Sequence, residues 1–123
     1  MSKKLPFLII PKRDSNFEEK LEIDAKTVAN LTGAPSTVLV EDIYHNGNKF
    51  AFYYCGQLCE VRFDDGSHHI QVSCIGYTEQ RSQEVLGYVC TNIRATLNFR
   101  GYDADVTKCF PYAIVTVKMY EEE

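Results

Sequence analysis

The 123-residue chain predicts an α+β fold, a mostly antiparallel sheet of about six strands with one short and one long helix packed on it. Two hairpin turns, at residues 45–48 and 64–67, lie within stretches of alternating apolar residues. A later stretch, residues 79–100, carries apolar residues at helical spacing. The length and a hydrophobic fraction of 45% suit one core, and we expect residues 1–123 to form a single α+β domain.

The first elements are a strand and a short helix. Residues 7–10 form a continuous apolar run, which is typical of a strand covered on both faces. Residues 12–20 are charged and predict a solvated connection. Asp24 suits the N-cap of a helix that ends at Thr32, because Gly33 fits the left-handed position after a helix.

Two hairpins follow this helix. Strands over residues 36–44 and 48–55 are expected to pair around Asn46-Gly47, a dipeptide that tolerates the positive φ of a type I′ turn. The turn at residues 64–67 is expected to place Phe63 opposite His68. One face of the second hairpin is apolar and predicts the core side: Cys59, Val61, Phe63, Ile70, Val72 and Cys74.

From Glu79 the apolar period changes from two residues to about 3.6, which predicts the long helix. Arg100 and Gly101 suit its end. Residues 108–120 predict a final strand, so the expected order is β-α-β-β-β-β-α-β. The helix residues expected to face the core are Val85, Leu86, Val89, Cys90, Ile93 and Leu97.

Charge and hydrophobicity disfavour several classes of partner. The chain has 13 Lys and Arg against 17 Asp and Glu, a net charge of −4, which disfavours binding of duplex nucleic acid. The apolar run at residues 7–10 is too short for a secretion signal or a membrane span, so we expect a cytoplasmic protein without membrane contact. The 5 cysteines are then expected to be reduced.

The residues predict no cofactor, no metal and no assigned catalytic group. Cys55, Cys59, His68, His69 and Cys74 lie in one meander, but the Cys-x3-Cys spacing has no second pair for a tetrahedral zinc site. Either histidine is a candidate general base beside an acidic turn. A small hydrolase or transferase that uses one of them stays an alternative, although no nucleophile motif or phosphate loop accompanies them.

The predicted long helix carries a second stripe beside its core stripe. Tyr88, Asn92, Ala95 and Phe99 follow one another at helical spacing, which is more than a helix packed on one sheet needs. Exposed apolar surface of this kind usually marks a partner site, so we predict a contact with a protein partner or a second copy. The alternative is that the sheet curls around the helix and covers both stripes.

Several polar residues lie on or just beyond the same helix and are candidates for binding an anion: Arg81, Arg94, Asn98, Arg100 and Tyr102. If two copies paired through the helix, these residues would line a pocket for an anionic, nucleotide-like ligand. The main expectation is a small, non-enzymatic binding module, a homo-oligomer that inhibits or antagonises a protein partner. A binder that sequesters the nucleotide-like ligand at the subunit boundary is the first alternative, and the histidine enzyme is the second.

Overall fold

The computed structural model describes residues 5–11, 18–33, 38–76, 78–109 and 111–117. It confirms the α+β fold with one six-stranded antiparallel sheet in the order β3-β4-β5-β6-β8-β7. The strands are β3 (Tyr44–Asn46), β4 (Lys49–Tyr54), β5 (Gln57–Phe63), β6 (His69–Ile75), β7 (Ala104–Cys109) and β8 (Tyr112–Val117).

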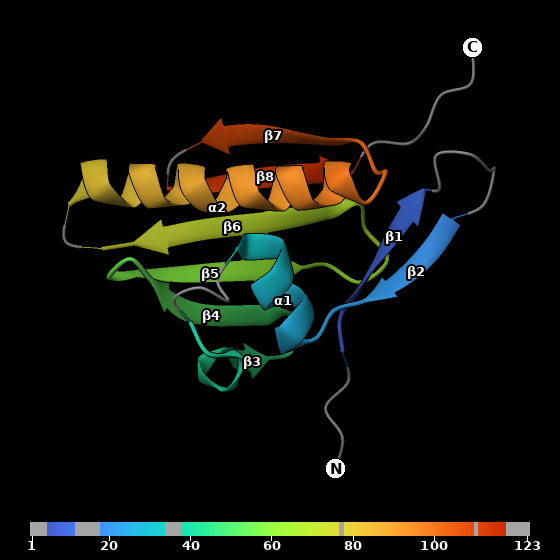
Figure 1. Cartoon of the computed structure of the whole chain (residues 1–123), viewed down its shortest axis with the longest axis horizontal. Helices are drawn as coiled ribbons and strands as arrows, with labels where there is room; N and C mark the ends of the chain where they lie inside the picture. Colours follow the sequence, from blue (N-terminus) through green and yellow to red (C-terminus); the bar gives the residue numbers. More distant parts are fainter. Residues whose placement is uncertain (1–4, 12–17, 34–37, 77, 110, 118–123) are drawn as a thin grey trace.

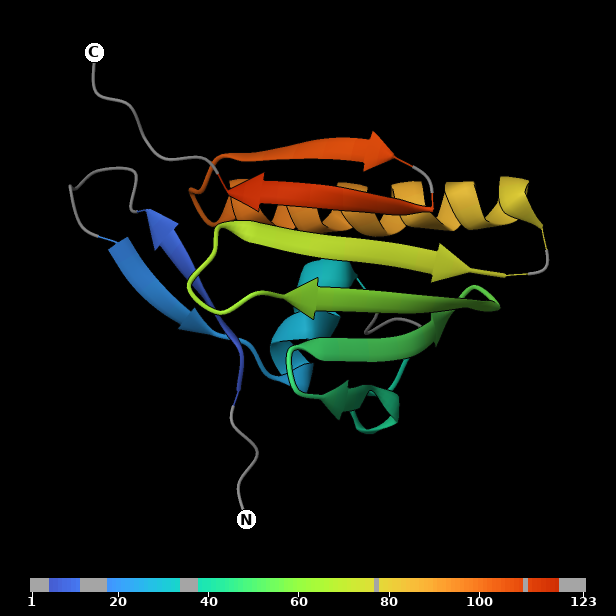
Figure 2. The ribbon, with the colours of Figure 1, turned by 180° about the vertical axis from the view of Figure 1, so that it is seen from behind.

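The molecule has two layers, because both helices cover the same face of the sheet. The short helix α1 (Ala25–Thr32) and the long helix α2 (Glu79–Phe99) lie side by side over this face (Figure 1). Seen from behind, the opposite face of the sheet carries no helix (Figure 2). The core lies between the two layers. Neither described helix combines the length and apolar character that a membrane crossing requires.

Both helices begin and end where local signals predict. At the start of α1, Asp24 Oδ1 accepts a hydrogen bond from the backbone N–H of Thr27 at 2.8 Å, and Gly33 adopts φ 75° after its last turn. At the start of α2, Thr78 Oγ1 accepts from the N–H of Arg81 at 3.1 Å. All six predicted core residues of α2 are buried, which confirms the assignment of its inner face.

Side chains of α2 hold the end of α1 in place. Asn92 Nδ2 donates to the carbonyl of Thr32 at 3.0 Å, and Thr96 Oγ1 donates to that of Leu31 at 3.5 Å. The last carbonyls of a helix have no partner within the helix, so these bonds satisfy groups that would otherwise need water. Gly33 also leaves room for Asn92, because an added Cβ would come within 2.6 Å of Asn92 Nδ2.

The predicted strand over residues 36–44 is wrong for most of its length. Val40–Asp42 form a 3₁₀ turn, and pairing begins only at Tyr44. An extended strand would place the adjacent residues Glu41 and Asp42 on opposite faces, so one carboxylate would face the core. In the structure both are exposed. Residues 36 and 37 lie outside the described residues.

The first hairpin turns one residue later than predicted. Asn46 pairs with Lys49, so the two residues at the tip of the turn are Gly47 and Asn48. Of these, Gly47 has φ 60°, and neither Asn46 nor Asn48 is among the residues with positive φ. A positive φ at the first tip residue alone is the pattern of a type II′ turn, not of the predicted type I′ turn.

The second hairpin has the predicted inner face but a different register. Phe63 pairs with Ile70, not with His68, and this shift by two residues also sets Cys59 opposite Cys74. The longer loop binds the N-terminal strand: Ile9 N donates to the carbonyl of Ser67 at 3.0 Å. A shift by two preserves the face on which every side chain lies, so the predicted core side is confirmed.

The N-terminal strand β1 (Phe7–Pro11) pairs with β2 (Glu18–Glu22), which the sequence did not predict. The two strands form a separate ribbon beside the main sheet (Figure 1). Leu8 is fully buried, whereas Phe7 and Ile9 are only partly so, which corrects the expectation of a strand covered on both faces. A charged segment such as β2 is compatible with a strand when its partner strand carries the buried side chains.

The final predicted strand, residues 108–120, is two strands. β7 and β8 pair antiparallel, with Lys108 opposite Ala113 and Cys109 opposite Tyr112. Proline lacks an amide hydrogen and is found in turns and at strand ends, so Pro111 is compatible with a reversal of the chain and not with a continuous central strand. Residues 118–120 lie outside the described residues.

Candidate functional site

The second stripe of α2 is only partly covered, because α1 packs against its middle. Asn92 is half-buried and bonded to α1, as described above. Tyr88 and Phe99 are 51% and 94% exposed, and Ala95 lies exposed between them. The stripe is therefore divided between an internal contact and open surface. We call the open part, made of Tyr88, Ala95 and Phe99, the α2 surface.

The geometry of the α2 surface suits contact with a protein. Tyr88 and Phe99 are eleven positions apart, which is about 16 Å along a helix. A small residue, Ala95, lies between the two rings. Aromatic residues are among the side chains that most often anchor protein interfaces. A fully buried inner face fixes the helix that carries them.

The structure separates Arg81 from the other predicted ligand residues. Arg81 lies in the first turn of α2 and forms an ion pair with Glu84 at 3.0 Å, which raises the pKa of the Arg81 guanidinium. Arg94 is thirteen positions further along the helix, about 20 Å away. One copy of the chain therefore does not bring Arg81 and Arg94 to the same ligand.

The other predicted ligand residues lie near the end of α2. Asn98 is one turn beyond Arg94, and Arg100 follows the last helical residue; the side chains of both Asn98 and Arg100 are exposed. Tyr102 is half-buried and packs against the core. The cluster consists of exposed groups around a helix end, and the structure does not describe an enclosed cavity among them.

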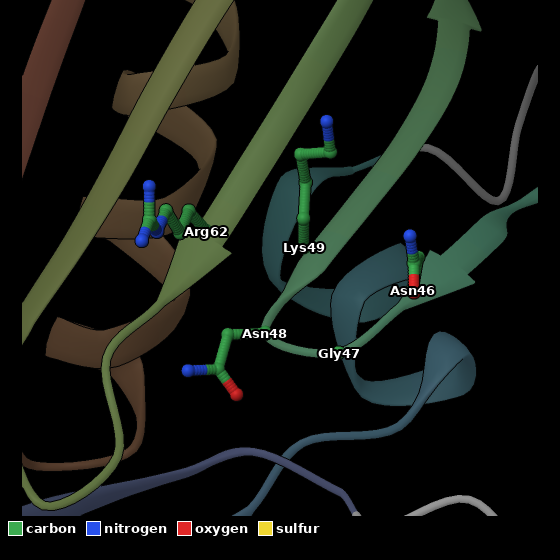
Figure 3. Close-up of a pocket in the computed structure, with 5 residues that line it drawn as sticks. All are labelled: Asn46, Gly47, Asn48, Lys49 and Arg62. Atoms are coloured by element: carbon green, nitrogen blue, oxygen red, sulfur yellow. The ribbon is translucent and has the colours of Figure 1, made fainter.

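A hollow that sequence reasoning missed lies beside the turn between β3 and β4. It has a volume of about 410 Å³ and is shown in Figure 3. The residues that line it are Asn46, Gly47, Asn48, Lys49 and Arg62. Both Lys49 and Arg62 line it because they are direct partners across β4 and β5. The hollow combines positive charge with amide groups, the donors that bind small anions.

Carboxylates moderate the charge of this hollow. Lys49 Nζ lies 3.7 Å from Glu60, and Arg62 Nε lies 3.6 Å from Asp64. Both pairs are partly exposed and longer than a hydrogen bond, so each contributes little to stability. The cations are therefore free to interact with a further negative group.

The two histidines proposed as general bases have different surroundings. His68 is half-buried, and its Nδ1 donates to the carbonyl of Ile9 at 2.8 Å. His69 is exposed, and its Nδ1 lies 3.2 Å from the hydroxyl of Thr116. Nucleophilic catalysis needs a base that a further group orients within a site sheltered from water. Neither hollow described in this structure, beside residues 46–49 or beside residues 74–79, includes a histidine.

The cysteines lie mainly in the core. Cys59 and Cys74 are buried partners across β5 and β6 with their sulfur atoms 3.1 Å apart, and Cys55, Cys59, Cys74 and Cys90 are all free thiols. The hydrogen bond with Cys74 and burial raise the pKa of Cys59, and burial raises that of Cys90 to about 11. Buried thiols with raised pKa values are poor nucleophiles. Within the described residues, no three His, Cys, Asp or Glu side chains form a group that could hold a metal.

The uncovered face of the sheet is a second surface that the sequence analysis did not single out. We call the side chains on β4, β5, β6 and β8 that point away from the helices the outer sheet face. Its exposed large apolar members are Tyr53, Ile75, Tyr112 and Ile114. The sequence signal for this face is the alternation of inward and outward side chains along each strand. In β8, for example, Tyr112 and Ile114 alternate with the buried Ala113 and Val115.

Comparisons of the chain with protein families, with characterised proteins and with solved structures found no match.

Proposed function

We propose that the protein is a non-enzymatic binding module that inhibits or antagonises a protein partner by occupying it through the α2 surface. The observation that carries this proposal is the exposure of Phe99, a residue that is 94% exposed at the end of a well-anchored helix. The helix fixes the backbone that carries this ring, so binding has to order only the side chain. Burying it in a partner removes a large apolar area from water.

The partner best suited to this surface has an apolar groove that accepts one side of a helix. Tyr88 and Phe99 are the two apolar anchors, and Ala95 lets the partner approach the helix between them.

The proposal is tested by capturing partners from extracts of the organism that makes the protein, with wild type and Phe99→Ser as baits. Leu39→Ser is the matched control, because Leu39 is an exposed apolar residue away from α2. A partner should bind the wild type and the control but bind Phe99→Ser at least about tenfold more weakly when purified. The proposal fails if every captured protein binds both variants equally.

A small anionic, nucleotide-like ligand is the second candidate, and the hollow of Figure 3 favours it over the arginines of α2. Lys49 and Asn48 offer a cation and an amide within this hollow. Native and denaturing mass spectrometry of the purified protein, with absorbance near 260 nm of the extracted material, tests this candidate. A bound anion should be lost in Lys49→Ala and retained in Arg94→Ala.

A further inference from the structure

We propose that the outer sheet face binds a second copy of this chain, so that two sheets pack face to face around a two-fold axis. This proposal concerns the surface opposite α2 and does not depend on the proposed function. Two of its residues, Tyr112 and Ile114, are 44% and 39% exposed. Apolar side chains on one face of a sheet are normally buried against another layer. In a single copy this face has no such layer in the part of the chain that the structure describes (Figure 2).

The strand register places the central residues of this face in two neighbouring rows. In the first row Glu60 pairs with Ser73, which pairs with Tyr112. In the second row Arg62 pairs with Gln71, which pairs with Ile114. The rows are two residues apart along each strand, about 6.6 Å. Each row therefore presents one charged, one polar and one apolar side chain in the same order across the sheet.

A two-fold axis that runs across the strands midway between the rows exchanges one row for the other. Arg62 of each copy then faces Glu60 of the second copy, which gives two contacts of opposite charge. Tyr112 faces Ile114 of the second copy. At the centre, Ser73 of each copy faces Gln71 of the other. On β5, β6 and β8 each position of the two rows thus meets a side chain of matching chemistry, and on β4 Lys49 faces the small side chain of Ala51 of the second copy.

Charge complementarity favours a second copy over an unrelated protein. Glu60 and Arg62 carry opposite charges on the same strand, so a partner with a single sign of charge would repel one of them. Both side chains are at least partly exposed, and their pairs with Lys49 and Asp64 at 3.7 and 3.6 Å leave them able to accept a further contact. A second copy supplies both charges at the required spacing.

The size of the face suits a small interface. Four strands about 4.8 Å apart and about 20 Å long cover roughly 400 Å² of flat area. Two such faces contribute about 800 Å² of flat area, and the corrugation of the side chains raises the buried area toward the lower end of the range of specific interfaces. Aligned packing of two sheets about 10 Å apart leaves space for the long Arg62 and Glu60 side chains between them.

The α2 surface lies on the other side of the sheet from this interface (Figures 1 and 2). A dimer of this kind therefore presents two α2 surfaces on opposite sides, both accessible. A partner with two matching sites would bind such a dimer more tightly than a single copy.

The test is the mass of the full chain in solution at micromolar concentrations, measured by light scattering after size exclusion. The wild type should have twice the mass of the chain. Arg62→Glu places like charges opposite each other twice and should raise the dimer dissociation constant at least about tenfold. The charge swap Glu60→Arg/Arg62→Glu should restore the dimer. Arg94→Glu, the same charge change on the opposite side of the molecule, is the matched control and should leave the mass unchanged.

Circular dichroism of each variant confirms that it is folded, and Ile114→Asp provides a second disruption that does not depend on the charged pair. A monomeric wild type overturns the proposal, and so does a dimer that persists in both Arg62→Glu and Ile114→Asp. A charge swap that stays monomeric contradicts the proposed pairing of Arg62 with Glu60. Loss of the dimer in Arg94→Glu would assign self-association to α2 instead.

Discussion

Single residues in this protein have requirements that composition does not reveal, and Gly76 is the clearest case. A Cβ at this position would occupy the space of the Gln57 amide group. Gln57 is almost fully buried, and its Oε1 accepts a hydrogen bond from Ser82 Oγ at 3.0 Å. Because Ser82 is buried as well, displacing the amide leaves a hydroxyl without its partner.

We therefore expect Gly76→Ala to lower the free energy of unfolding by about 1–3 kcal/mol. The measurement is urea denaturation followed by circular dichroism. Gly87→Ala is the matched control, because the nearest atom to an added Cβ there is Lys108 Nζ at an ordinary 3.5 Å. In the interior of α2 this control should stabilise the protein by about 0.5–1 kcal/mol. Equal effects of the two substitutions would contradict the packing of Gln57 against Gly76.

At the scale of elements, the helices follow from local chemistry. The start of α1 depends on Asp24, which accepts hydrogen bonds from the N–H and the hydroxyl of Thr27, each at 2.8 Å. These bonds, the backbone one above all, hold the pKa of Asp24 below its ordinary value. The cap therefore stabilises the fold fully above the ordinary carboxyl pKa, near 4, and this contribution is lost as pH falls through the lower pKa of the folded protein.

We expect Asp24→Ala to cost about 1 kcal/mol at neutral pH, and less as the pH falls below about 4, because Asp24 is then protonated first in the unfolded chain and, at lower pH, in the folded protein as well. Asp24→Asn is the control, because asparagine also caps helices but does not titrate in this range. Thermal unfolding of the three proteins as a function of pH provides the measurement. If the difference between wild type and Asp24→Ala were the same at pH 3 and pH 7, the ionised carboxylate would not be the cap.

A second prediction at the scale of elements concerns the inner face of α2 and its contribution to stability. Val89 and Ile93 are fully buried against the sheet. Val89→Asp or Ile93→Asp places an unpaired charge in the core, and we expect each to destabilise the protein by more than about 3 kcal/mol. Thr91→Asp, on the exposed side of the same helix, should change stability by less than about 0.5 kcal/mol. Chemical denaturation measures all three, and a tolerated Val89→Asp would mean that the wrong face has been assigned to the core.

The sequence predicts helices and inner faces better than it predicts strand pairing. The limits of α1 and α2 depend on neighbouring residues such as Asp24 and Gly33, so they can be read locally. The register of β5 and β6 depends on the distant strand β1, which bonds to the loop at Ser67. A pattern with a period of two residues fixes the face but cannot distinguish registers that differ by two.

The candidate sites show the same limit. The helical spacing of Tyr88 and Phe99 predicts exposed rings on one side of α2, and both are exposed. That spacing cannot show that the side chain of Asn92 forms a hydrogen bond with the end of α1, which is a separate element. The hollow at Lys49 and Arg62 depends on strand register, so it emerges only from the structure.

At the scale of the whole molecule, the β1–β2 ribbon is joined to the main sheet mainly through one loop. Leu8 is buried in the core, and Phe7 and Ile9 form hydrogen bonds with the loop between β5 and β6. His68 adds a side-chain hydrogen bond to the carbonyl of Ile9 at 2.8 Å. Elements with few contacts open at a lower free energy than the core, so the ribbon should be the least protected part of the described fold.

We therefore expect His68→Ala to speed amide hydrogen exchange in β1 severalfold while exchange in the core strands β5 and β6 stays slow, because the lost bond lies only between the ribbon and the loop. His69→Ala is the matched control: its ring contacts the exposed side of Thr116, so β1 should keep its wild-type protection. Exchange followed by mass spectrometry of peptides covers both regions in one experiment. Equal protection of β1 in both variants would show that His68 does not hold the ribbon, and its hydrogen bond would lose the structural role assigned to it. Unchanged protection of β1 in His69→Ala would also indicate that the two adjacent histidines have different roles. His68 would then support the fold, and His69 would belong to the exposed surface.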